Sequence, residues 1–145
     1  MTSPPPSAIL AIDPGRDKCG LALVAGSGAC LRRAIVPRAE LLPALRQWVA
    51  ETGVALAVLG DRTGSRDALA EIRGLAVFES IELVDEHRST EEARQLYFRE
   101  QPARGLARLI PAGLRSPRVP IDDFAAWVLG RRYMAAFARR GGQEG

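Results

Sequence analysis

The sequence has no apolar run of the roughly 18 uncharged residues that a membrane-spanning helix needs. Its first residues carry no basic segment, and Asp13 interrupts the first apolar run, so we expect no secretory signal. Only two cysteines are present, Cys19 and Cys30, and they predict no disulfide framework. These absences favour a cytoplasmic protein without membrane contact.

Lysine and aromatic residues are also scarce. Lys18 is the only lysine, so nearly all positive charge is arginine; the net charge is +3 and the isoelectric point is near 9.4. Arginine suits bidentate contacts to phosphate, although a GC-rich genome produces the same bias. The mildly basic charge permits an anionic partner without requiring one. With 6% aromatic residues, few of them placed to stack on bases, a nucleic acid would be recognised by its shape and backbone.

The length of 145 residues suits one domain with a single core. We expect that domain at residues 8–139, between flexible tails at 1–7 and 140–145. Apolar runs bounded by Gly and Pro predict strands at 8–13, 19–24, 29–36, 54–60 and 81–85, and helical spacing predicts helices at 39–51, 66–73, 89–99 and 121–139. This order predicts an α/β fold: a mixed five-stranded sheet, antiparallel in its first three strands and flanked by helices.

Acidic residues stand where the predicted elements end or begin. Asp13, Asp61 and Glu86 follow strands, while Asp122 and Asp123 open the last helix. In such sheets the carboxyl ends of the strands form the binding edge, so the acids could converge there. Each acid alone also has a simpler interpretation, as a turn residue, a solvated strand end or a helix N-terminal charge. Converging carboxylates would repel one another, and a hard divalent cation such as Mg²⁺ or Mn²⁺ would remove that penalty.

Three segments carry a resemblance to a known family. They are Asp13-Pro14-Gly15 with Gly20 after it, the run from Val84 to Ala93 that contains Asp85-Glu86-His87-Arg88, and Ile121-Asp122-Asp123-Phe124-Ala125-Ala126. In this order, and over roughly residues 8–138, they resemble the three signatures of the YqgF family. That family belongs to the RuvC-like branch of the ribonuclease-H-like fold.

The resemblance implies a metal-dependent nuclease that hydrolyses phosphodiester bonds of nucleic acid with a two-metal site of Mg²⁺ or Mn²⁺. It implies that Asp13, Glu86 and Asp122 are the catalytic residues and metal ligands. Asp123 is a weaker candidate ligand, because one step along a helix rotates a side chain by about 100°.

The chain departs from the family pattern at three positions. His87 interrupts the Asp-Glu-Arg-like motif, Asp17 stands where many members have a basic residue, and Ala125 stands where RuvC has a second helix acid. His87 invites a role as a general base, but on a continuing strand it would point away from Glu86. Its role therefore stays open.

Basic residues near these motifs are candidate phosphate contacts, with solvated surface as the alternative. They are Arg16, Lys18, Arg62, Arg88, Arg115 and Arg118.

The usual assignments of the family leave several functions open. The first is maturation of the 5′ end of pre-16S ribosomal RNA, and the second is Holliday junction resolution or cleavage of branched or single-stranded DNA. A third is a nucleic-acid-binding module without catalysis. A phosphotransferase of the actin and sugar-kinase kind would need a second lobe, and the chain has only one Asp-x-Gly hairpin. A resolvase should be a two-fold dimer, so monomer and homodimer both stay open.

Overall fold

The computed structural model describes residues 7–62, 65–100 and 120–144. Strands and helices follow one another in the expected order. The elements are β1 (Ala8–Pro14), β2 (Lys18–Ala25), β3 (Cys30–Pro37), a 3₁₀ turn η1 (Arg38–Glu40), α1 (Leu41–Thr52), β4 (Leu56–Gly60), α2 (Ser65–Leu75), β5 (Ser80–Val84), α3 (Ser89–Glu100) and α4 (Asp122–Glu144).

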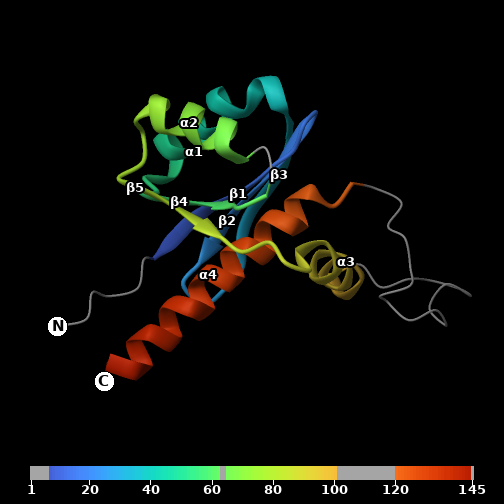
Figure 1. The fold of residues 1–145 in the computed structure, drawn as a ribbon, viewed down its shortest axis with the longest axis vertical. Coiled ribbons are helices and arrows are strands. Elements are labelled where there is room, and N and C mark those ends of the chain that lie inside the picture. The colour runs from blue at the N-terminus through green and yellow to red at the C-terminus, as the bar shows by residue number, and fades with distance from the viewer. Residues whose placement is uncertain (1–6, 63–64, 101–119, 145) are drawn as a thin grey trace, which may run out of the picture.

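The five strands form one sheet in the order β3-β2-β1-β4-β5 (Figure 1). β1, β2 and β3 are antiparallel neighbours, because short turns join them, whereas β4 and β5 run parallel to β1. Parallel neighbours need a crossover connection, and α1 and α2 supply it. The predicted α/β fold, with a mixed five-stranded sheet whose first three strands are antiparallel, is confirmed.

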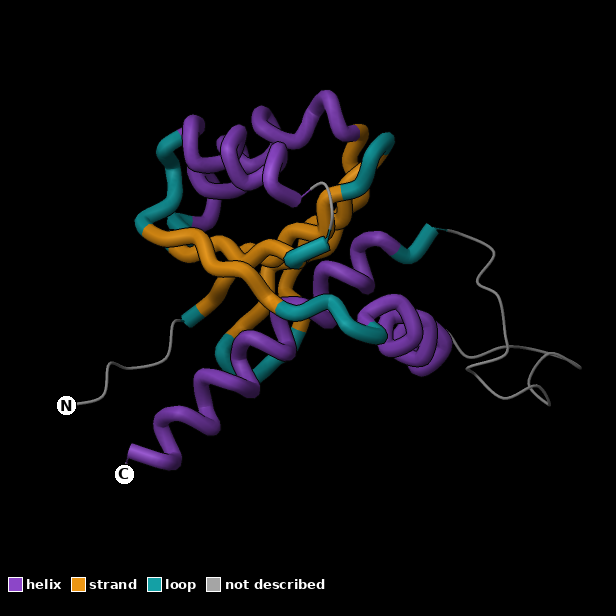
Figure 2. The backbone as a smooth tube through the Cα atoms, in the orientation of Figure 1, coloured by secondary structure: helices purple, strands orange, loops and turns teal. Residues whose placement is uncertain are grey.

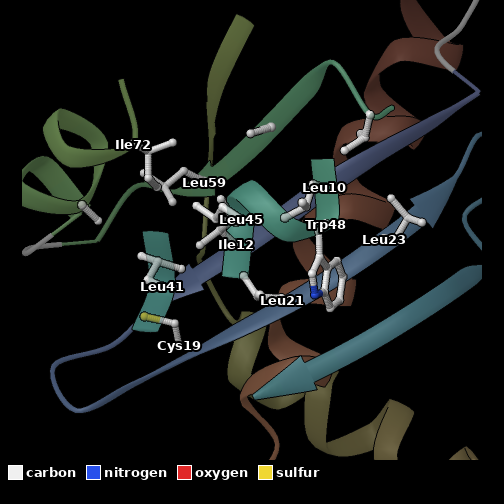
Figure 3. Close-up of a cluster of buried hydrophobic side chains, with 13 residues drawn as sticks. Leu10, Ile12, Cys19, Leu21, Leu23, Leu41, Leu45, Trp48, Leu59 and Ile72 are labelled. Carbon is white, nitrogen blue, oxygen red and sulfur yellow. The ribbon is translucent and has the colours of Figure 1, made fainter. Parts of the chain in front are cut away.

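Strand residues alternate between two cores, one on each face of the sheet. Leu10 and Ile12 of β1 pack with Leu45 and Trp48 of α1 (Figure 3), while Ile9 and its neighbours on the other face pack against α4. Figure 2 shows the resulting layers, with α1 and α2 on one face of the sheet and α3 and α4 on the other. Truncating a fully buried leucine of this kind to alanine would lower the free energy of unfolding by about 3 kcal/mol. The packing of these residues therefore contributes strongly to the stability of the sheet.

Helix α4 lies directly on the sheet, chiefly over β2 and β1. A Cβ at Gly130 would run into the side chain of Val24, so the absence of a side chain lets the helix approach closely. α3 packs against the outer side of α4, where the rings of Tyr97 and Phe124 meet edge to face at 5.5 Å. The N-terminal end of α4 is thereby fixed against the sheet.

The observed boundaries differ from the predicted ones at a few places. The fifth strand ends at Val84, one residue earlier than expected, so Asp85 already belongs to the loop. α4 continues to Glu144, past the end expected at Arg139, so residues 140–144 are helical in backbone where a flexible tail was expected. Glycine in a helix costs only about 1 kcal/mol relative to alanine, which is too little for the Gly pair to stop a long helix. In the part of the chain that the structure describes, no helix is long and apolar enough to cross a membrane.

Candidate active site

Asp13 lies near the end of β1, on the sheet face that α4 covers. The alternation of the strand sets this orientation, because Ala11, two residues earlier, packs against α4. Across the antiparallel pair Asp13 faces Gly20 of β2. On its other side, the parallel register continues past Leu59 to Gly60 at the end of β4. The acid is therefore flanked by a glycine on each neighbouring strand.

The two glycines leave the space that two further acids occupy. A Cβ at Gly20 would overlap the backbone carbonyl of Asp122, and a Cβ at Gly60 would overlap the carboxylate of Glu86. The first residue of α4 therefore rests on β2, and the Glu86 carboxylate rests on β4. Asp13, Glu86 and Asp122, which the resemblance to the YqgF family implies as a set, are brought to one place from the beginning, middle and end of the chain.

Glu86 is buried, with 4% of its surface exposed, and its polar groups are held by the segment after β4. Its backbone N–H donates to Oδ1 of Asp61 at 3.2 Å. Its Oε2 accepts from the backbone N–H of Arg62 at 3.1 Å and lies 3.2 Å from Nε of the same arginine. A buried carboxylate is costly without such partners. These contacts therefore supply the partners that the buried carboxylate of Glu86 needs.

Asp122 opens α4, where the positive end of the helix dipole favours an acid. Its Oδ2 lies 3.7 Å from Nζ of Lys18, and 28% of its side chain is exposed. The pair is weak because the lysine is itself 47% exposed. The contact between Asp122 and Lys18 is therefore open to solvent at the N-terminal end of α4.

The pKa of Asp13 is raised from its ordinary value of 3.8 to about 7. Burial is the largest cause, followed by a side-chain hydrogen bond to Glu86 and by the negative charges of Glu86 and Asp122; the charge of Arg62 acts in the opposite direction. Glu86 and Asp122 are thus close enough to Asp13 to raise the pKa of its carboxyl group. Near neutral pH, a substantial fraction of Asp13 retains a proton that an isolated aspartate would have lost.

The donor set fits a hard divalent cation, because all three side chains offer carboxylate oxygens and their mutual repulsion would be relieved by positive charge. Among residues 7–62, 65–100 and 120–144, however, no group of three or more His, Cys, Asp or Glu side chains is gathered as a ready coordination shell. Two of the acids are turned toward Lys18 and Arg62 instead. Lys18 and Arg62 therefore offset part of the negative charge that a cation would otherwise neutralise.

Asp123, the weaker candidate ligand, has a different environment. Its Oδ2 lies 3.2 Å from Nε of Arg33 on β3, and its Oδ1 accepts from the backbone N–H of Phe124 at 3.0 Å. The Arg33 guanidinium also lies 4.2 Å from the centre of the Phe124 ring. Asp123 therefore joins α4 to β3, and no sequence signal pointed to Arg33 as its partner.

The residues that follow Glu86 turn away from the buried site. His87 is exposed, and its backbone N–H donates to Oδ1 of Asp85 at 2.9 Å. Arg88 is exposed as well. Its φ of 59° lies in the left-handed region, which residues with a side chain adopt mainly in tight turns. The strand has ended before Glu86, so the alternation that placed His87 opposite to it does not apply.

The other predicted phosphate contacts are distributed unevenly. Lys18 and Arg62 lie at the acids, whereas Arg16 is exposed in the turn between β1 and β2. Arg115 and Arg118 lie outside the described residues. Asp61, whose membership of the site was open, supports Glu86 through the backbone contact given above. Gly60 was not identified from the sequence as part of the site. The one sequence feature that could have indicated it is its position as the glycine at the end of an apolar strand.

Comparison with solved structures finds RuvC of Thermus thermophilus. RuvC in complex with a Holliday junction substrate superposes with a TM-score of 0.62 at 15% sequence identity, covering 93% of this chain and 96% of that one. A second structure of the same resolvase gives a TM-score of 0.54 at 16% identity with the same coverage. No protein-family model and no curated protein sequence matches the chain. The predicted ribonuclease-H-like fold of the RuvC kind is confirmed, and membership of the YqgF family stays a prediction.

Proposed function

We propose that the protein is a metal-dependent nuclease that hydrolyses phosphodiester bonds of nucleic acid. The observation that carries the proposal is the gathering of Asp13, Glu86 and Asp122 on one edge of the sheet. There, burial first and then the hydrogen bond to Glu86 and the charges of the other two acids raise the pKa of Asp13 to about 7. Three carboxyl groups so close together are an unfavourable arrangement unless a cation or a proton offsets their charge. A bound Mg²⁺ or Mn²⁺ would offset this charge, so a metal site accounts for the arrangement of the three acids.

In this mechanism Asp13, Glu86 and Asp122 would hold the metal. When bound, a pair of such ions supplies an activated water and stabilises the leaving oxygen of the phosphodiester. Asp13 must give up its proton before its carboxylate can act as a ligand, so it couples metal binding to pH. Glu86 is the most constrained of the three, because Asp61 and Arg62 fix its backbone and its carboxylate.

Lys18 and Arg62 act as the first contacts of the substrate backbone. Each lies beside one of the acids and each is largely exposed. A phosphate that approaches the acids therefore meets both side chains. Their transfer from carboxylate to phosphate would leave the acids available to cations, and Arg62 offers a guanidinium suited to phosphate geometry.

The substrate that we propose first is a ribosomal RNA precursor, with cleavage at the 5′ end of pre-16S ribosomal RNA. Ala125, where the RuvC pattern has a further acid, is 9% exposed and lies in the apolar cluster between α3 and α4. A carboxylate there would lie in an apolar cluster with Phe124 and Val128, where burial disfavours its charged form. A donor set limited to three acids supports the YqgF pattern over that of RuvC.

Holliday junction resolution, or cleavage of other branched or single-stranded DNA, is the second candidate. The likeness to RuvC over nearly the whole chain favours it. A resolvase must cut two strands symmetrically, so this function requires a two-fold homodimer, whereas cleavage of a single RNA strand can be performed by a monomer.

The deciding experiment presents the purified protein with end-labelled pre-16S ribosomal RNA, single-stranded DNA and a four-way junction, each with Mg²⁺ or Mn²⁺. Asp13→Asn and Asp122→Asn should abolish cleavage, because each removes a ligand charge. Asp67→Asn serves as the matched control, because Asp67 is an exposed acid on α2, across the sheet. Light scattering on the same samples gives the oligomeric state.

The outcomes separate the candidates. Cleavage of RNA by a monomer supports the first function, and paired cuts in the junction by a dimer support the second. Binding of nucleic acid without cleavage under every metal condition would replace both with a non-catalytic binding module. Cleavage that survives Asp13→Asn would place the activity elsewhere and end the proposal.

A further inference from the structure

Arg132 joins the segment that carries Glu86 to α4. Arg132 lies on α4, well beyond Asp122 along the same helix, and 22% of its side chain is exposed. Its Nη1 donates to the backbone carbonyl of Asp85 at 2.8 Å, and its Nη2 donates to Oε1 of Glu92 at 2.7 Å. Asp85 directly precedes Glu86, and Glu92 lies in the first turn of the helix that follows it.

One guanidinium therefore contacts both ends of the segment 85–92, which comprises the loop after β5 and the first turn of α3. The planar fork of arginine suits this double contact, because its two terminal nitrogens reach separate acceptors at once. Within the loop, hydrogen bonds from Ser89 N–H to the Glu86 carbonyl and from Glu92 N–H to the Arg88 carbonyl close a compact turn.

Glu86 is thus connected to two different parts of the protein. Asp61 and Arg62 attach it to the end of β4, while Arg132 attaches its loop to the helix that begins with Asp122. Without Arg132 the contact to β4 would remain, but the segment would lose two hydrogen bonds to α4, beside the apolar packing of α3 on that helix. The spacing between Glu86 and Asp122 would then be less well defined.

We infer that Arg132 is a positioning residue, which sets the placement of Glu86 relative to Asp122 by clamping the loop between β5 and α3 to α4. This inference rests on the proposed function, since Arg132 would affect metal binding only through the acids of the site. Residues that orient metal ligands from outside typically contribute 10- to 100-fold to metal affinity or activity. We expect Arg132→Met to weaken Mn²⁺ binding by about 10-fold or more.

The test compares Arg132→Met with Arg131→Met, a matched control that removes the same charge from the adjacent, exposed position of α4. Arg132→Lys keeps the charge but replaces the two separate terminal nitrogens with one, and Glu92→Gln keeps an acceptor without its charge. Mn²⁺ affinity is measured by calorimetry, and hydrogen exchange of the amides of residues 85–92 is followed without metal. Circular dichroism checks that each variant folds, and Arg132→Lys carries the test if Arg132→Met does not.

The positioning role predicts faster exchange at residues 85–92 and weaker Mn²⁺ binding in Arg132→Met, partial recovery in Arg132→Lys and no change in Arg131→Met. Unchanged exchange in both Arg132 variants would overturn it, and so would full recovery of Mn²⁺ affinity in Arg132→Lys, which would reduce the role to charge alone. If the wild-type protein binds no Mn²⁺, the proposed nuclease fails, while the exchange measurement still decides whether Arg132 holds the loop.

Discussion

Replacing Asp13 with asparagine should stabilise the protein, and increasingly so as the pH rises. The folded protein holds the Asp13 proton up to a pKa of about 7, whereas an unfolded chain releases it near 3.8. The folded state therefore binds more protons than the unfolded state between these values. Linkage then requires the free energy of unfolding to fall as pH increases through this window. Asparagine resembles the protonated acid in shape and carries no charge. The free energy of unfolding of the variant therefore does not show the part of this decrease that comes from Asp13.

The magnitude follows from the size of the shift. A difference of one pKa unit corresponds to about 1.4 kcal/mol, so the contribution of Asp13 falls by about 3 kcal/mol between pH 5 and pH 8. For a chain of this length, that corresponds to roughly 6–12 °C in melting temperature. Thermal unfolding of wild type and Asp13→Asn, followed by circular dichroism in metal-free buffers across this range, measures the widening gap.

The control is Asp67→Asn, which removes an exposed acid from α2. Its melting temperature should run parallel to that of the wild type at all pH values. The reasoning would be refuted if the curves of Asp13→Asn and wild type also ran parallel, because the folded protein would then hold no extra proton at Asp13. A gap that narrows with rising pH would reverse the sign and refute it as well.

Three further predictions test the site from other directions. Gly60→Ala should lower the cleavage rate at least 10-fold by displacing the Glu86 carboxylate, while Gly74→Ala, where a Cβ meets open space, should leave it unchanged in a steady-state assay. Saturating Mn²⁺ at pH 8 should raise the free energy of unfolding by about 2.7 kcal/mol at 100 times its dissociation constant, and a melting temperature that ignores the ion would contradict this. Lys18→Met and Arg62→Met should each reduce the slope of log K against log salt for nucleic-acid binding by about one, measured by fluorescence anisotropy; an unchanged slope would remove that residue from the phosphate contacts.

The antiparallel pairing of the first three strands and the placement of Asp13 and Glu86 at one edge of the sheet could be predicted from the sequence, because both follow from local patterns. Continuous apolar runs identified β1 and β4 as central strands, and short Gly-bearing links made the first three strands antiparallel. Once the strands are in place, the carboxyl ends of parallel strands share an edge. Asp13 and Glu86 therefore had to lie on that edge, whatever the details of packing.

The partners of the acids could not be predicted, because they depend on register and helix rotation between distant segments. Arg62 was expected to contact phosphate, and the structure shows its guanidinium 3.2 Å from Glu86. Asp123 was one of two adjacent acids, and only the rotation of α4 over β3 decides that it meets Arg33. The close approach at Gly60 likewise depends on where the loop after β5 returns to the sheet. A single sequence carries no local signal for such contacts.

Glu86 and Asp13 differ in how fully their charge is offset, and this difference makes a final prediction. Glu86 has a guanidinium and a backbone N–H on its carboxylate, whereas the pKa of Asp13 is raised by burial and by Glu86 itself. Glu86→Gln should therefore lower the pKa of Asp13, because it removes a hydrogen-bonding carboxylate and a negative charge, yet leave it above 3.8 because the burial persists. Carboxyl carbon NMR titration measures this directly, and Glu82→Gln, an exposed acid of β5, is the matched control. If the titration of Asp13 were the same in Glu86→Gln as in wild type, the two carboxyl groups would not be coupled, and the shared site would lose its physical basis.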